Sequence, residues 1–273
     1  MSEMLAEASA RCKRDLLPMN RRRPEAEPAS HCRRRRNIKR PEARLGYSAL
    51  VADTSLRQLE RRWRETGSEE HHADVLRELV RVGRLAAWKL ELAAHVGHPA
   101  ACLATGRLLT PTSLAGWGLA FGQWDQQVVF FAAGAVARAA IPLYPEDVTD
   151  ERPLEAAEFL FRWIESPLGV ERKALIAQAA SAEVGGNGLA PPACHVAFCI
   201  SEAIRTGFAA GSAKAAEDLA RSLTWAGAAI SGVKDRYPYA QLAEMVEQDT
   251  VSVERLKEQV QRGVAPYCLG DNV

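Results

Sequence analysis

Alanine is the residue that most restricts what this chain can fold into. The sequence contains 47 alanines among 273 residues, while β-branched and aromatic residues are sparse. Alanine has the most favourable helix propensity because it loses no side-chain entropy in a helix and buries no polar group. We therefore predict an all-α protein.

Apolar residues recur at helical spacing from residue 54 onward. Leu56, Leu59 and Trp63 follow Ser55 at this spacing, which predicts a helix that begins at Ser55 and runs to about Thr66. About ten helices are expected, joined by short links that contain Gly or Pro and show no repeat of fixed period. The expected architecture is an irregular antiparallel helical bundle or a short α-solenoid.

Two later segments carry specific expectations. A glycine cluster at 185–188 should end a helix that spans about 170–184 and should form a mobile loop. Near the C-terminus, residues 237–239 should start a short helix, 252–261 should form a last charged helix, and 268–273 should be a tail.

The formal net charge of +1 averages two unlike parts of the chain. Residues 1–44 hold 13 Lys and Arg against 6 Asp and Glu, whereas the rest holds 22 against 28. We divide the chain into a disordered basic N-terminal arm (1–50), an alanine-rich helical domain (51–235) and polar C-terminal helices with a tail packed on it (236–273).

The basic arm supports one hypothesis about function. Its clustered cations are typical of a segment that binds nucleic acid or an anionic surface, although a solvated polycation has the same composition. The residues of this candidate nucleic-acid site are Arg21, Arg22, Arg23, Arg33, Arg34, Arg35, Arg36, Lys39 and Arg40.

The sequence indicates a cytoplasmic protein. Its longest apolar run, 128–137, is shorter than the roughly 20 residues that cross a bilayer, so we interpret it as a buried core helix. The N-terminus has no apolar segment typical of a signal peptide. Cys102, Cys194 and Cys199 lie in alanine-rich helical context, and we expect them to be reduced packing residues.

Neither a metal nor a cofactor is expected from the motifs present. The histidines at 71, 72, 95 and 98 lack the i, i+4 spacing of a helical metal site, and Cys194, His195 and Cys199 have no second ligand pair at zinc-finger spacing. The sequence also has no phosphate loop, nucleophile elbow or dinucleotide fingerprint. We expect a protein that is not an enzyme, and an enzyme ranks third among the alternatives because a helical bundle can assemble a site from distant residues.

Carboxylates and aromatic side chains are the remaining candidates. Asp147, Asp150, Glu151, Glu155 and Glu158 gather around the start of a helix expected at Pro153, and favourable interaction with the helix dipole explains such a cluster without any function. The aromatic residues of the middle helices are expected in the core, although an exposed subset would suit a binding face. They are Trp117, Phe121, Trp124, Phe130, Phe131, Phe159, Phe161 and Trp163.

Three stretches together resemble a known kind of protein. They are LELAAHVGHPAACLA (90–104), WGLAFGQWDQQVVFFAAGAVARAAIPLY (117–144) and RPLEAAEFLFRWIESP (152–167). They resemble an alanine-rich, all-helical bacterial family that is similar to predicted immunity proteins of polymorphic-toxin systems. The likeness covers about 55–232 and depends most on the segments 138–142 and 153–163.

The resemblance implies a non-catalytic protein that binds another protein. An immunity or antitoxin-like protein of a bacterial conflict system would cover the active site of a toxin, and the acidic body of this chain would suit a basic toxin. We therefore expect the five carboxylates named above to contact a protein partner. The alternative is a nucleic-acid-associated accessory or regulatory protein that acts through the basic arm.

Overall fold

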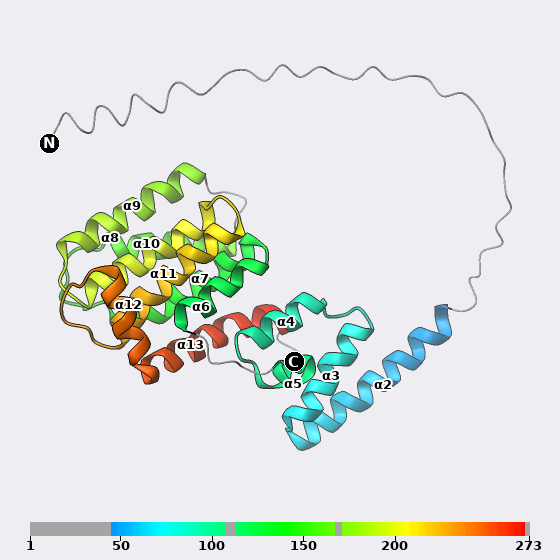
Figure 1. Cartoon of the computed structure of the whole chain (residues 1–273). Helices are drawn as coiled ribbons and strands as arrows, with labels where there is room; N and C mark the ends of the chain where they lie inside the picture. Colours follow the sequence, from blue (N-terminus) through cyan, green and yellow to red (C-terminus); the bar gives the residue numbers. More distant parts are fainter. Residues whose placement is uncertain (1–44, 108–112, 167–170, 271–273) are drawn as a thin grey trace, which may run out of the picture. The chain divides into compact units, whose positions relative to one another are not determined.

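The computed structural model describes residues 45–107, 113–166 and 171–270, with side chains from residue 54 onward. Within these ranges the chain forms twelve α-helices, two short 3-10 helices and no strand, so the predicted all-α class is confirmed (Figure 1). The α-helices are α2 (Leu45–Thr66), α3 (Glu69–Arg81), α4 (Ala87–His95), α5 (Pro99–Thr105), α6 (Leu114–Leu119), α7 (Gln126–Ala140), α8 (Arg152–Glu165), α9 (Arg172–Gly188), α10 (Ala193–Phe208), α11 (Ser212–Ile230), α12 (Tyr239–Gln248) and α13 (Thr250–Leu269). The 3-10 helices are η1 (Ala120–Gln123) and η2 (Ile141–Leu143).

The centre of the fold consists of α7, α10 and α11, each of which packs on the other two. Ile200, Ile204, Leu219 and Leu223 are almost completely buried between these helices and their neighbours. Alanines fill many of the remaining contact positions, and their small side chains let helix axes approach closely. The alanine-rich composition therefore gives a core with short distances between helices.

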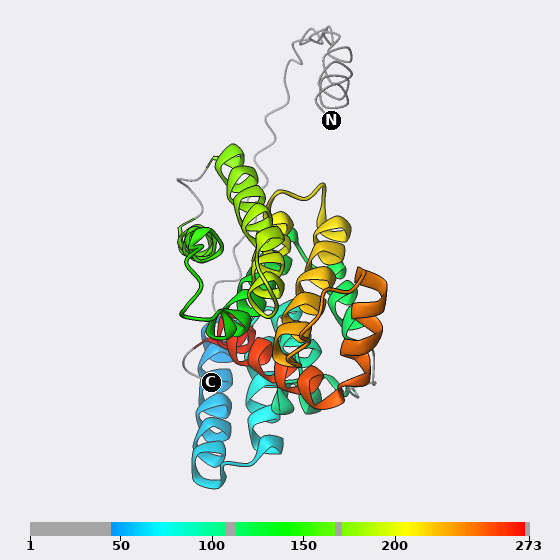
Figure 2. The same ribbon diagram turned by 90° about the vertical axis from the view of Figure 1, so that its left-hand side faces the viewer.

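A second group of helices comes from the N-terminal side of the described chain. Helices α2 and α3 lie side by side in both views, α3 also packs on α5, and α4 packs on α5 (Figures 1 and 2). His98 caps α5 at the turn after α4, because its Nδ1 atom accepts a hydrogen bond from the backbone N–H of Ala101, and Pro99 opens the helix. The last helix, α13, packs on both α4 and α7 and so connects the two groups.

The predicted start of the first helix was wrong. Helix α2 begins at Leu45, so Ser55 lies inside the helix and does not cap it. No proline occurs between Pro41 and Pro99, and Ala49 and Ala52 favour continuation of the helix through this stretch. The capping pattern at Ser55 therefore does not mark the start of a helix.

The prediction of a mobile loop at 185–188 was also wrong. Helix α9 continues to Gly188, because the glycines allow close packing on neighbouring helices. A methyl group at Gly186 would lie 3.0 Å from the Cβ atom of Ala197 on α10, and Gly185 is buried against Pro153 on α8. The Arg236 guanidinium then donates hydrogen bonds to the carbonyls of Gly186 and Leu189, which stabilises the end of α9.

The C-terminal segment is more ordered than its sequence indicated. The last helix was expected over 252–261, but α13 runs from Thr250 to Leu269. Cys268 and Leu269, which the prediction placed in a tail, are buried. The apolar stripe of α13 continues past residue 261 with Val264, and tertiary packing of this stripe outweighs the cost of Pro266 inside the helix. The domain boundaries at 50 and 235 stay predictions.

Candidate functional site

The predicted acidic surface lies at the start of α8 and in the loop before it. The side chains of Asp147, Glu151, Glu155 and Glu158 are exposed, and none of the four has an ion pair with another described residue. Asp150 differs from them, because its carboxylate lies 2.5 Å from the Arg152 guanidinium, and this partner lowers the pKa of Asp150. The structure thus leaves four of the five carboxylates available to a partner and engages the fifth within the loop.

The candidate nucleic-acid site falls outside the described residues. All nine cations from Arg21 to Arg40 precede residue 45, where the description of the chain begins. The hypothesis of nucleic-acid binding therefore stays a prediction from the sequence.

The histidines lie within aromatic packing. The His72 ring stacks on Trp63 with centroids 4.2 Å apart, and His95 lies 5.0 Å from Trp124. His95 also exchanges hydrogen bonds with Trp117, because its Nε2 atom lies 3.2 Å from the Trp117 carbonyl and the Trp117 indole donates to the His95 carbonyl. Within the ranges that the structure describes, no group of three His, Cys, Asp or Glu side chains is placed to hold a metal ion.

Burial gives the Cys194–His195–Cys199 cluster the character of neutral core residues. The pKa of Cys199 is raised to about 12 by burial, and burial also raises the pKa of Cys194. The pKa of His195 is lowered to about 4, first by burial and then by the charge of Arg236. A nucleophilic thiol needs a lowered pKa, so this environment opposes the reactivity that a Cys–His system requires.

A charged network links α10 and α11, which sequence reasoning did not identify. The Asp218 carboxylate lies 2.9 Å from Arg221 and 3.2 Å from Lys214, and Arg221 lies 3.6 Å from Glu202 on α10. The pKa of Glu202 is raised, mainly by burial. These groups neutralise one another across a helix pair, which is the arrangement expected of a structural ion network.

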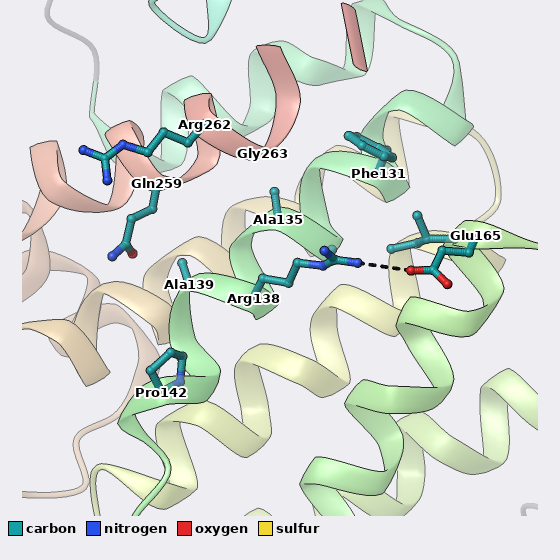
Figure 3. A pocket seen from close by; sticks show the side chains of 11 residues that line it. Phe131, Ala135, Arg138, Ala139, Pro142, Glu165, Gln259, Arg262 and Gly263 are labelled. Carbon is teal, nitrogen blue, oxygen red and sulfur yellow. Dashed lines mark ion pairs between the residues drawn. The ribbon is translucent and has the colours of Figure 1, made fainter. Parts of the chain in front are cut away.

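An open groove follows the exposed side of α7 and is the strongest candidate site. One part has a volume of about 520 Å³ and lies between α7, the end of α8 and α13. Its walls are mainly apolar, with Phe131, Ala135, Ala139 and Ile164 among them (Figure 3). We call this part, together with the adjoining one described next, the α7 groove.

The second part of the α7 groove adjoins the first at Phe131 and Ile164, which line both. It has a volume of about 460 Å³ and lies toward the start of α7. Four aromatic side chains contribute to its walls, namely Phe130, Phe131, Trp163 and Tyr267. Since the lining residues on α7 extend from Gln126 to Ala139 and an α-helix rises 1.5 Å per residue, the groove is about 20 Å long.

Small residues explain why three helices meet here. A methyl group at Gly263 of α13 would lie 2.8 Å from the Cβ atom of Ala135, and one at Gly134 of α7 would overlap the Ile164 side chain. Glycine at both positions therefore lets α8 and α13 approach α7 closely. The floor of the groove is therefore formed by small side chains.

Polar groups line two sides of the first part of the groove. The Arg138 guanidinium extends from α7 toward α8, where it lies 3.7 Å from Glu165 and over the ring of Phe161 (Figure 3). Gln259 and Arg262 project from α13 on the opposite side. The Oε1 atom of Gln259 is buried and has no hydrogen-bond partner within the described chain.

Helix α7 together with η2 has the length and composition of a membrane span. The window 126–143 has a mean hydropathy of 1.3, but 56% of it is buried inside the protein. The core helix of a folded domain has the same properties, and α7 packs on α10, α11 and α13. We interpret α7 as a core helix with one side left open as the groove.

No family model, curated protein or solved structure matches this chain.

Proposed function

We propose that this chain is a non-catalytic, cytoplasmic protein that holds a segment of a partner protein in the α7 groove. The observation that carries the proposal is the groove itself, which is open, mainly apolar and about 20 Å long. An amphipathic helix of about 13 residues has this length, and helices commonly bind by laying an apolar face into such a groove. Small residues along the floor favour a helix, because they allow its backbone to come close.

The narrower form of the proposal is an immunity or antitoxin-like role in a bacterial conflict system. It is supported by the resemblance of the segments 90–104, 117–144 and 152–167 to that class of protein. The exposed carboxylates of α8 would supply a second contact, and their charge suits a basic toxin. Electrostatic complementarity of this kind accelerates association and selects between partners.

Affinity capture with matched variants tests the proposal. The full chain is used as bait in its own cells, beside Ala139→Leu, which narrows the groove, and Ala180→Leu, which makes the same change on the exposed side of α9. We expect one partner whose recovery falls at least about tenfold with Ala139→Leu and is unchanged with Ala180→Leu, since a clash at an interface core costs more than about 1.4 kcal/mol. Equal recovery with all three baits would contradict binding in the groove.

Charge reversal separates the contact made by the five carboxylates from the contact made by the α7 groove. Substitution of Asp147, Asp150, Glu151, Glu155 and Glu158 by Lys should reduce capture of a basic partner. Unchanged capture would remove this surface from the interface and leave the groove as the binding site. Circular dichroism of each variant checks that its helices are retained.

A further inference from the structure

The end of the α7 groove near Asp125 combines aromatic rings with one negative charge. Asp125 is the one charged residue among those that line this part within the described chain. Its side chain accepts a hydrogen bond from the backbone N–H of Gln127, which makes it the N-cap of α7, and it remains exposed. The Phe130 and Trp163 rings pack edge to face with centroids 4.1 Å apart, and Phe131 stacks on Tyr267 at 4.4 Å.

The partial charges of the backbone around this end oppose one another. The Gln126 Nε2 atom donates to the carbonyls of Thr206 and Ala209 at the C-terminal end of α10. That end carries roughly half a negative charge, and the N-terminus of α7, which Asp125 caps, carries a similar positive one. The Asp125 carboxylate is therefore the one full charge among the described residues that line this part of the groove.

Two cations lie nearby, and both are held by backbone carbonyls. Lys89 lies 5.2 Å from the centre of the Tyr267 ring and 3.5 Å from the Tyr267 carbonyl oxygen. Arg172 donates to the carbonyl of Phe208 at 2.9 Å. Neither lines the part of the groove that holds Asp125. Lys89 is nevertheless close enough to weaken the attraction of a second cation. Removal of the Lys89 charge should therefore have the opposite effect on cation binding to removal of the Asp125 charge.

The geometry points to a cationic side chain of the partner, an arginine or lysine, that binds among these aromatic rings next to Asp125. This inference rests on the proposed function, since it names what one end of the bound segment carries. A guanidinium or ammonium group is attracted to aromatic faces and gains further from a carboxylate beside them. The apolar remainder of the groove would hold the adjoining apolar residues of the same segment.

Three small probes of equal chain length test the inference on the full chain. They are hexylguanidinium, 1-hexanol and hexanoate, which share an apolar tail and differ in the charge of the head group. Binding is measured from amide chemical shifts of Gly207, at the Asp125 end, and of Ala135, in the middle of the groove. We expect hexylguanidinium to bind about fivefold more tightly than hexanol, and hexanoate to bind more weakly than both.

Two variants identify the groups responsible. Asp125→Asn retains an oxygen that can cap α7 but removes the charge, so it should abolish the preference for hexylguanidinium. Lys89→Gln removes the competing cation and should strengthen hexylguanidinium binding. Neither variant should change the affinity for hexanol.

The outcomes distinguish this inference from the proposed function. Equal binding of hexanol and hexylguanidinium, or a cation preference that survives Asp125→Asn, would overturn the cationic site while the groove remained an apolar binding surface. Failure of all three probes to shift Ala135 or Gly207 would overturn both, because the groove would then not accept an apolar chain.

Discussion

Lowering the pH from 7 to 5 should reduce the free energy of unfolding by several kcal/mol. His72, His95 and His195 are each less than one-tenth exposed, and burial lowers the pKa of each from 6.5 to about 4. Between these values the unfolded chain binds protons that the folded chain does not bind. The stabilising contribution of these three buried, neutral histidines is therefore complete above pH 6.5 and is lost as the pH falls toward 4. The loss is about 2 kcal/mol for each histidine between pH 7 and 5.

Charged neighbours do not reverse the lowering of the histidine pKa values or the loss of stability at low pH. The Glu69 carboxylate lies 3.9 Å from His72 Nδ1, but it is half-exposed, and burial of the imidazole outweighs its attraction. The lowered pKa values of Glu70, Glu78 and Asp150 act below pH 5, since these carboxyl groups already titrate near 4 when unfolded. Burial raises the pKa of Glu202, which offsets part of the loss, so the net loss of stability between pH 7 and 5 comes from the histidines.

Chemical denaturation of the wild type and His72→Phe at pH 7, 6 and 5 measures the effect. Phenylalanine preserves the stack on Trp63 and removes one titrating group whose Nε2 atom has no partner in the described chain. We expect similar stability of the two proteins at pH 7 and an advantage of about 2 kcal/mol for His72→Phe at pH 5. Parallel loss of stability in both proteins would show that His72 is not buried in its neutral form.

Gly207→Ala should destabilise the protein by about 2 kcal/mol, although alanine is the better helix former. Gly207 lies near the end of α10, where an added methyl group would overlap the Trp163 ring and lie 2.9 Å from Cε2 of Phe130. Both rings also line the α7 groove, so this glycine allows the aromatic end of the groove to form.

Gly188→Ala is the matched control for this substitution. Gly188 also ends a helix, but a methyl group there would meet no atom within 4 Å, so we expect a change between zero and about 1 kcal/mol in the stabilising direction. Combining Gly207→Ala with Trp163→Leu should cost less than the sum of the two single changes, because leucine vacates the space that the methyl group needs. Wild-type stability of Gly207→Ala would contradict the packing described for α7, α8 and α10.

The helices could be predicted wherever a local signal coincided with a helix end. Gly97, His98 and Pro99 are such a signal, since capping and backbone preferences act within one turn. At 185–188 the same kind of signal misled the prediction, because packing of Gly185 and Gly186 on α8 and α10 outweighs the low helix propensity of glycine. Local propensity is a weak guide at such a contact.

The groove could not be predicted from the sequence, whereas the acidic cluster could. Asp147 to Glu158 are neighbours in the chain, so their grouping is visible without a fold. The first part of the groove joins residues 131–142, 164–165 and 259–263, which only tertiary packing brings together. The one available signal was the pair of helical glycines Gly134 and Gly263, a pattern that indicates close helix contact but does not say which helices meet.

Site-specific photo-cross-linking tests the central claim, that a partner segment occupies the α7 groove. Benzoylphenylalanine is introduced at Arg262, an exposed residue at the rim of the groove, or at Ala180 on the exposed side of α9, and full-length protein is irradiated in its own cells. We predict a covalent adduct with a single partner from position 262 only, and mass spectrometry should map the cross-link to one amphipathic helical segment that carries a basic residue. Equal adducts from both positions, or none from position 262, would contradict the account.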